Sequence, residues 1–214
     1  MIPVNILAVR YLPGADPGLA KALGASRGRT SLAMLTTDCD DATYIALDAA
    51  TKAADVEVSY ARSFYAGASN ASTPNAGEVI GILAGTTPGI VRSGMDAALG
   101  ALCRLGFDEV CGVPYLAHTV SSVGSFLAKE AGVPLGSAIA YLIAPPLEGM
   151  YAMDAALKAA DVKLCKLYSP PSETNFGGGL LSGTQSACAA ACEAFAAAVA
   201  DVAKMPYKEL RSPK

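Results

Sequence analysis

The sequence has little histidine, and this scarcity excludes several classes of enzyme. His118 is the one histidine among 214 residues. Most serine–histidine–aspartate, cysteine–histidine and histidine–metal schemes are therefore removed. The stretch "FGGGLLSGT" lacks the lysine of a phosphate-binding P-loop, and "GTQSACA" lacks the G-x-S-x-G spacing of a nucleophile elbow. The sequence predicts a protein that is not an enzyme and uses no cofactor.

Charge is scarce as well. Only 16% of the residues are charged, whereas about 25% is usual in soluble domains. The net charge is −3 and no basic stripe is present, so we expect no nucleic-acid partner. A surface this poor in charge indicates either extensive burial against other subunits or a merely alanine-rich monomer, and we favour the first interpretation.

Long apolar runs and a leader are missing too. No run of about 20 apolar residues occurs, so we expect no membrane span. The start, "MIPVNILAVRYLPG", has no charged n-region and no small-residue cleavage site, so we expect no signal peptide. Six cysteines in such a chain are expected to be reduced thiols. Cys188 and Cys192 share one face of a predicted helix and could hold half of a metal site, but buried thiols are the favoured interpretation.

The sequence does contain an internal repeat. "DAATKAADV" (Asp48–Val56) returns as "DAALKAADV" (Asp154–Val162), at an offset of 106 (154 − 48). The match extends backwards without a gap, from residues 31–48 over residues 137–154, and forwards at an offset of 98, from "GILAGT" over "GLLSGT". Self-similarity of this kind predicts two copies of a unit of about 100 residues, which is a normal size for a small domain.

Both copies show the same order of predicted elements. In the first copy, "SLAMLTT" is a predicted strand, "DDATYIALDAATKAADV" a helix, and "VEVSYARSFYA" and "EVIGILAG" two more strands. A helix ending at Gly106 follows, and the second copy closes with the helix "TQSACAAACEAFAAAVADVAK". We place the first domain at residues 1–106 and the second at residues 107–214. The order β-α-β-β-α predicts the α+β class, with a ferredoxin-like, largely antiparallel sheet and helices on one side.

The motifs in this order resemble the bacterial microcompartment shell domain. "DDATYIALDAATKAADVEVSYARSFYAGA", "YLIAPPLE" and "PPSETNF" are similar to shell proteins of ethanolamine utilisation. The resemblance implies two tandem, circularly permuted shell domains and a homotrimer that mimics a hexagonal tile. It also implies contacts with other shell proteins in the microcompartment shell, in the bacterial cytoplasm. The alternatives are a ferredoxin-like small-molecule binding or sensor module, and an enzyme that uses acidic residues with a divalent metal.

A group of acids distinguishes the two copies. "TTDCDD" places Asp38, Asp40 and Asp41 at a strand-to-helix junction, where the second copy has "IAPPLE". Glu78 follows a polar loop, and its counterpart is expected within the triple glycine of the second copy. Helix capping needs one aspartate, not three. The resemblance implies a small acidic pore in each subunit, with Asp40, Asp41 and Glu78 at its acidic positions. Asp38, beside them, and Phe107, at the join between the copies, are further candidates, Phe107 as an apolar wall. Such a pore would attract a small cationic metabolite, such as ethanolamine, without binding it tightly.

Two lysines are candidates for the edge of the tile. The resemblance implies that Lys52 and Lys158, on the repeated helix, pack against their counterparts on a neighbouring tile. The alternative is a solvated lysine in an ion pair with the aspartate four residues earlier.

Two polar loops, Ser63–Gly77 and Pro170–Gly179, are candidates for a gate. The resemblance implies that they meet at a central pore for larger metabolites or cofactors and rearrange there. The triple glycine would give the second loop the backbone freedom of a switch. The alternative is a pair of ordinary surface loops. The predicted gate residues are Ser63, Tyr65, Gly67, Asn70, Pro74, Gly77, Pro170, Glu173, Asn175, Phe176, Gly177, Gly178 and Gly179.

Overall fold

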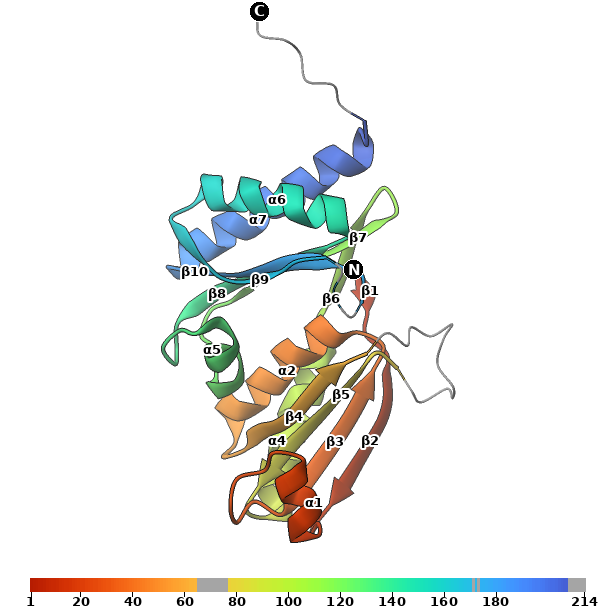
Figure 1. Ribbon diagram of the computed structural model, residues 1–214, viewed down its shortest axis with the longest axis vertical. Helices are drawn as coiled ribbons and strands as arrows, with labels where there is room; N and C mark the ends of the chain where they lie inside the picture. The colour runs from red at the N-terminus through yellow and green to blue at the C-terminus, as the bar shows by residue number, and fades with distance from the viewer. Residues whose placement is uncertain (65–76, 171, 173, 208–214) are drawn as a thin grey trace, which may run out of the picture. The chain divides into compact units, whose positions relative to one another are not determined.

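The computed structural model describes residues 1–64, 77–170, 172 and 174–207. Contacts within the chain group it into two compact units (Figure 1). The first unit contains Pro3–Gly106 and Val120–Ser137. The second unit contains Met1–Ile2, Phe107–Thr119 and Ala138–Lys214.

The first unit is built on a four-stranded antiparallel sheet. Its strands are β2 (Ile6–Leu12), β3 (Ser31–Thr37), β4 (Glu57–Ser63) and β5 (Val79–Gly85), in the order β2-β3-β5-β4. Its helices are α1 (Pro17–Ala22), α2 (Asp40–Ala53), α4 (Pro88–Leu102) and α5 (Ser125–Ala131). Helices α2 and α4 pack on each other and on the sheet. A side chain at Gly81 would meet Leu47 of α2, so this glycine brings helix and sheet close together.

The second unit repeats this plan around a larger sheet. Its strands are β1 (Ile2–Pro3), β6 (Gly106–Val110), β7 (Val113–Val120), β8 (Ala138–Ala144), β9 (Val162–Tyr168) and β10 (Gly177–Gly183), in the order β1-β6-β7-β8-β10-β9. Helices α6 (Pro146–Ala159) and α7 (Gln185–Lys204) lie together over one face of this sheet (Figure 1). Their core is rich in alanine, with Phe195 as the largest side chain. The predicted α+β class with antiparallel sheets is confirmed.

The boundaries of the two compact units differ from the boundaries of the two sequence copies. The boundary between residues 106 and 107 stays a prediction for the two copies, while Val120–Ser137 of the second copy belongs to the first unit. The physical reason lies in α2, where Asp48 accepts hydrogen bonds from the backbone N–H groups of Gly124 and Leu127. These bonds hold α5 to the first copy.

The ungapped match between the copies is wrong by one residue in the strand. Strands β3 and β8 each have seven residues and lie at an offset of 107, whereas α2 and α6 each have 14 residues at an offset of 106. The strand-to-helix junction therefore contains Asp38 and Cys39 in the first copy and Pro145 alone in the second. The strand pairing shows this register, because Ser31 pairs with Gly85 and Ala138 pairs with Gly183, which matches Gly85 at the offset of 98.

The triple glycine belongs to a strand and not to a loop. Gly177, Gly178 and Gly179 begin β10 and are buried. A side chain at Gly178, whose φ is 154°, would collide with the carbonyl oxygen of Leu142 in β8, and one at Gly149 of α6 would lie 2.5 Å from the carbonyl oxygen of Gly177. These glycines allow the backbones of neighbouring elements to approach closely. The observed loop therefore ends before Gly177 and is shorter than the predicted loop Pro170–Gly179.

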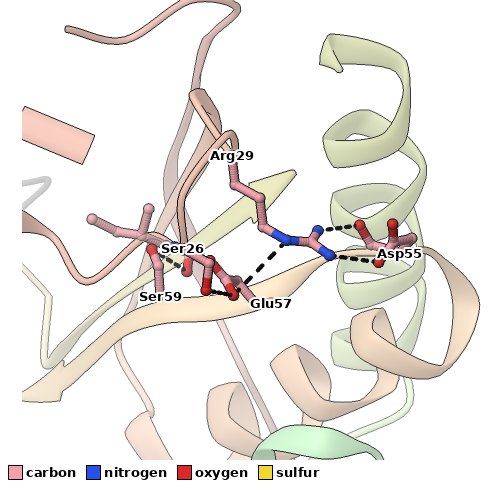
Figure 2. A network of polar contacts seen from close by, with 6 residues as sticks. Ser26, Arg29, Asp55, Glu57 and Ser59 are labelled. Atoms are coloured by element: carbon pink, nitrogen blue, oxygen red, sulfur yellow. Dashed lines mark hydrogen bonds and ion pairs between the residues drawn. The ribbon is translucent and has the colours of Figure 1, made fainter. Parts of the chain in front are cut away.

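A polar network fixes the connection between α1 and β3 to the edge strand β4 (Figure 2). The Arg29 guanidinium lies 2.7 Å from Asp55 Oδ1 and 3.9 Å from Glu57 Oε2. Glu57 in turn accepts hydrogen bonds from the backbone and the hydroxyl of Ser26, both at 2.6 Å. At the second-copy position of Glu57 stands Lys163, so the network belongs to the first copy. It holds the short helix α1 against its own sheet.

Helix α7 is long and apolar enough, by length and composition, to cross a membrane. Its apolar face, however, lies in the core of the second unit, where Cys188, Cys192 and Phe195 pack against α6 and the sheet. The core helix of a soluble protein passes the same test of length and composition. Both thiols are free and buried, as expected, and burial raises their pKa values.

Candidate functional site

The acidic group begins directly after β3. Asp38 is held by Asn5, whose backbone N–H donates to Oδ1 at 2.8 Å and whose side-chain amide donates to Oδ2 at 2.6 Å. The backbone of the junction is held by Thr37 and Thr43, since Thr43 Oγ1 donates to the Cys39 carbonyl at 2.7 Å and Thr37 Oγ1 lies 2.7 Å from Thr43 Oγ1. The acids therefore stand on a fixed turn.

Asp40 and Asp41 occupy the first turn of α2 and are almost completely buried, at 8% and 7% exposure. Neither is the N-cap residue of the helix, because that residue is Cys39, which makes no side-chain cap bond. Instead, Asp40 Oδ1 accepts the Asp41 N–H at 2.9 Å. Burial raises the pKa of Asp40, opposed by hydrogen bonds from the backbone and from Ser63. The positive end of the helix dipole also favours the ionised carboxylates.

Glu78 joins these acids from the start of β5. Its backbone N–H donates to the Thr37 carbonyl at 2.8 Å, which ties it to the end of β3. Gly77 has a φ of 60°, and a side chain there would collide with the same carbonyl, so glycine is required for the approach. Burial, together with the charges of Asp40 and Asp38, raises the pKa of Glu78 to about 7. The structure thus brings Asp38, Asp40 and Glu78 within electrostatic reach of one another.

Three further side chains at this cluster were not among the predicted acidic-pore residues. Burial raises the pKa of Tyr44 to about 12, helped by Asp40 and Asp41 and opposed by hydrogen bonds with Ser63. Burial and Asp41 raise the pKa of the Cys39 thiol. Tyr44 lies one helical turn after Asp40 and so faces the same side, which is the signal that could have identified it. We call Asp38, Cys39, Asp40, Asp41, Tyr44, Ser63 and Glu78 the acidic cluster.

The second copy has an apolar counterpart of this cluster. Strands β5 and β10 match at an offset of 98, so the residue of the second copy that corresponds to Glu78 is Phe176 and not one of the three glycines. The positive φ values of Gly77 (60°) and Asn175 (63°) support this match. Phe176 packs against Phe107, with ring centroids 5.7 Å apart. Phe107 therefore contacts the apolar counterpart, and its predicted role as a wall of the acidic pore stays a prediction.

The two candidate edge lysines differ in their surroundings. Lys52 Nζ donates to the Ser122 carbonyl at 2.8 Å and lies 3.4 Å from Asp48 Oδ2, whose side chain is fully buried. Lys158 Nζ lies 2.6 Å from Asp154 Oδ2, and both side chains are exposed, at 74% and 64%. The expected i, i+4 ion pair is present in both copies, and the role at a tile edge stays a prediction.

The predicted gate is only partly within the described residues. Ser63 ends β4, Gly77 precedes Glu78, and Pro170, Asn175 and Phe176 precede β10. Tyr65, Gly67, Asn70, Pro74 and Glu173 lie outside the described residues. Within the part of the chain that is described, no group of three or more histidine, cysteine, aspartate or glutamate side chains could hold a metal ion.

Comparison with known proteins identifies the family of this chain. A family model described as the BMC domain matches residues 31–113. The bacterial microcompartment shell protein EutL of Clostridium perfringens is 55% identical over 213 residues, which cover 96% of this chain and 97% of that protein. The crystal structure of ethanolamine utilization protein EutL from Leptotrichia buccalis has a TM-score of 0.94 and 55% identity, and covers 97% of this chain and 98% of that one.

A more distant structure shares the fold alone. The trimeric bacterial microcompartment shell protein PduB has a TM-score of 0.78 at 19% identity, covering 94% of this chain and 90% of that one. The nearer relatives match almost the whole length at more than half identity. The chain therefore belongs to the bacterial microcompartment shell proteins, of the EutL type, which are structural proteins of the shell and not enzymes.

Proposed function

We propose that this chain forms a homotrimeric tile in the shell of an ethanolamine-utilisation microcompartment, in the bacterial cytoplasm, beside other shell proteins. Its two copies per chain support this proposal, because three chains then supply six copies of one unit. A head-to-tail contact repeated at a fixed rotation closes such a ring. The low charge of 16% fits a surface that is largely covered by subunits.

Each acidic cluster lines a small pore that favours a small cation. The observation that carries this part is Glu78, whose pKa is raised to about 7 by burial and by Asp40 and Asp38. A carboxyl that is costly to ionise beside other acids gains most when a cation arrives, because the cation relieves both the repulsion and the desolvation. The apolar counterpart in the second copy shows that the shared fold does not need these acids.

The expected cation is protonated ethanolamine, since the similar protein from Leptotrichia buccalis is named an ethanolamine utilization protein. Passage through a pore requires weak binding, so we expect millimolar affinity, about −4 kcal/mol. A gated central pore for larger metabolites or cofactors completes the proposal. That gate rests on the family resemblance alone, because several of its residues lie outside the described part of the chain.

Calorimetric titration with ethanolamine tests the pore. The parent should bind ethanolamine and not the neutral diol ethylene glycol, and Glu78→Gln should weaken binding by about tenfold or more by removing one charge. Glu109→Gln is the matched control, because Glu109 is an exposed acid in the second unit. Equal binding of the diol, or unchanged binding in Glu78→Gln, would show that the cluster does not select charge.

A further inference from the structure

The acidic cluster is held in place by the start of β2, the edge strand of the first sheet. Asn5, the residue before β2, contacts Asp38 at three points. Its backbone N–H donates to Asp38 Oδ1 at 2.8 Å, its side-chain amide donates to Oδ2 at 2.6 Å, and its carbonyl accepts the Asp38 N–H at 3.3 Å. Both carboxylate oxygens of Asp38 therefore already accept hydrogen bonds from the chain itself.

These contacts fix Asp38 in one orientation. Hydrogen bonds to a charged acceptor are short and about twice as strong as those between neutral groups. A carboxylate held by two of them must break at least one to turn towards a ligand. Asp38 thus differs from Glu78, whose backbone is tied to the Thr37 carbonyl while burial and neighbouring acids act on its carboxyl.

A β-bulge brings Asn5 to this position. The pairing of β2 with β3 shifts by one residue between Ile6 and Ala8, so Leu7 is an extra residue in β2. Without this shift, Ile6 would stand opposite Asp38, and an apolar side chain would replace the amide. Bulges are frequent at sheet edges and beside functional sites, where they change the direction of a side chain.

The extra residue packs on the other arm of the cluster. A side chain at Gly77 would lie 2.8 Å from Leu7 Cδ1, so the Leu7 side chain lies directly over this glycine. Glu78 is the next residue, and its N–H donates to the Thr37 carbonyl at 2.8 Å. The start of β2 therefore contacts both segments that supply the acids. We call Asn5 and Leu7 the β2 clamp.

The second copy has neither this clamp nor the acid that it holds. The match of "YL" in the two copies, at an offset of 104 (115 − 11), makes Glu109 the counterpart of Asn5. Glu109 lies near the end of β6, where the chain turns at Cys111 into β7. The junction after β8 contains Pro145 alone, with no counterpart of Asp38. The shared fold therefore does not need the clamp.

We propose that Asn5, within the β2 clamp, is a positioning residue of the acidic pore, and that Asp38 acts on a bound cation through Glu78 rather than by direct contact. This inference rests on the proposed function and deepens it, because it separates an acid that contacts the cation from an acid that strengthens the negative field around it. A like charge held at a fixed place opposes ionisation of Glu78 until a cation arrives.

The charges that act on Glu78 come from the junction and from α2. Burial is the largest cause of its raised pKa, followed by Asp40 and then by Asp38. The Cys39 thiol lies in the same group, and its pKa is raised mainly by burial and, among other charges, by Glu78. From β2 and β4 the groups are neutral, namely the amide of the β2 clamp and the Ser63 hydroxyl. Displacement of Asp38 should therefore change the ionisation of Glu78.

The titration of Glu78 in the ligand-free protein tests this inference. Carbon-13 NMR of glutamate-labelled protein follows its carboxyl, whose signal is the one missing in Glu78→Gln. Asn5→Ala and Asp38→Asn should each lower the midpoint by about half a pH unit, because the first frees Asp38 to move into solvent and the second removes its charge. In calorimetry at pH 8, both variants should weaken ethanolamine binding about threefold.

Exchange of the two side chains provides a rescue. Asn5→Asp alone sets two carboxylates against each other, whereas Asn5→Asp with Asp38→Asn again pairs an amide with a carboxylate and keeps one negative charge there. The midpoint and the affinity should then return most of the way to those of the parent. Ser26→Ala is the matched control, because Ser26 also bonds a carboxylate through backbone and side chain, at Glu57, at the far end of β4 from Ser63 (Figure 2).

The outcomes separate the clamp from the pore. A midpoint that does not move in Asn5→Ala or in Asp38→Asn, an equal fall in Ser26→Ala, or an exchange variant no better than the single variants would overturn the inference. Asp38→Asn keeps the size of the side chain, so it decides the question even where Asn5→Ala does not fold. A parent that binds no ethanolamine would refute the proposed pore, whereas the NMR midpoints would still report on the clamp.

Discussion

The repeated motif offers a comparison of two aspartates in nearly identical sequence. Asp48→Ala should destabilise the protein strongly, whereas Asp154→Ala should have little effect. Asp48 has no exposed side-chain surface and accepts two backbone N–H groups of α5, at 2.7 and 2.8 Å. Asp154 is 64% exposed and, within the described residues, pairs with exposed Lys158.

The expected sizes follow from these contacts. Hydrogen bonds to a charged acceptor contribute about 1.5–3 kcal/mol each, so removing Asp48 should cost about 3–5 kcal/mol and leave two buried donors unpaired. An exposed i, i+4 ion pair contributes about 0.3–0.5 kcal/mol, which is the expected cost of Asp154→Ala. The two substitutions, made in the same motif, should therefore differ by several kcal/mol in the free energy of unfolding.

Urea unfolding and amide hydrogen exchange measure the two parts of this prediction. The midpoint should fall clearly in Asp48→Ala alone, and exchange should rise first in α5, at Gly124 and Leu127, because these N–H groups lose their acceptor. Equal destabilisation by the two substitutions, or unchanged protection of α5 in Asp48→Ala, would refute this account of how Asp48 holds α5 on α2.

Two further predictions concern charge. The pKa of Glu78 is raised from 4.5 to about 7, so the folded protein holds its proton more tightly than the unfolded chain does, and stability should fall as pH rises from about 4.5 to 7. Glu78→Gln should remove that slope, worth about 1–2 kcal/mol after allowance for the exposure of the carboxyl, in urea unfolding across this range. Ethanolamine affinity should rise over the same interval. Lys158→Ala should leave the trimer intact and reduce sheets in electron microscopy, whereas sheets like those of the parent would make Lys158 an ordinary surface lysine.

Much of the fold could be predicted because hydrophobic pattern and helix signals are local. The strand 31–37, the helix from Asp40 and the final helix to Lys204 all lie where the sequence indicates. Helix α5 was not predicted, because seven residues carry little periodicity and its main partner, Asp48, lies 76 to 79 positions away. Such long-range capping leaves no local signal.

The two errors at the second copy have separate physical origins. An ungapped match assumes equal spacing, but the first copy has one more residue between strand and helix, at Asp38 and Cys39. The triple glycine was interpreted as flexible because glycine serves both mobile loops and tight packing, and sequence alone does not separate the two. Only the carbonyl of Leu142, close to Gly178, shows which use applies.

The acidic residues could be predicted from the sequence because the second copy lacks them. The side chains that contact them could not be predicted. Ser63 and Tyr44 approach Asp40 from β4 and α2, and a sequence places no side chain of β4 beside a helix start. Their presence changes the chemistry of the cluster, since a hydroxyl that bonds Asp40 stabilises its charged form while burial opposes it.

Fusion of two copies in one chain allows the acidic cluster and the repeated helix to differ between the first and the second copy. In a ring of six identical units, any acid placed after β3 would appear six times, and so would any change in the repeated helix. In the tandem chain, Phe176 stands at the position that matches Glu78, and Leu157 at the position that matches Thr51, so the proposed trimer would hold each of these side chains three times. The contact of α5 with α2 lies within one compact unit, where Asp48 is fully buried against the N–H groups of Gly124 and Leu127, so its geometry is set before any assembly.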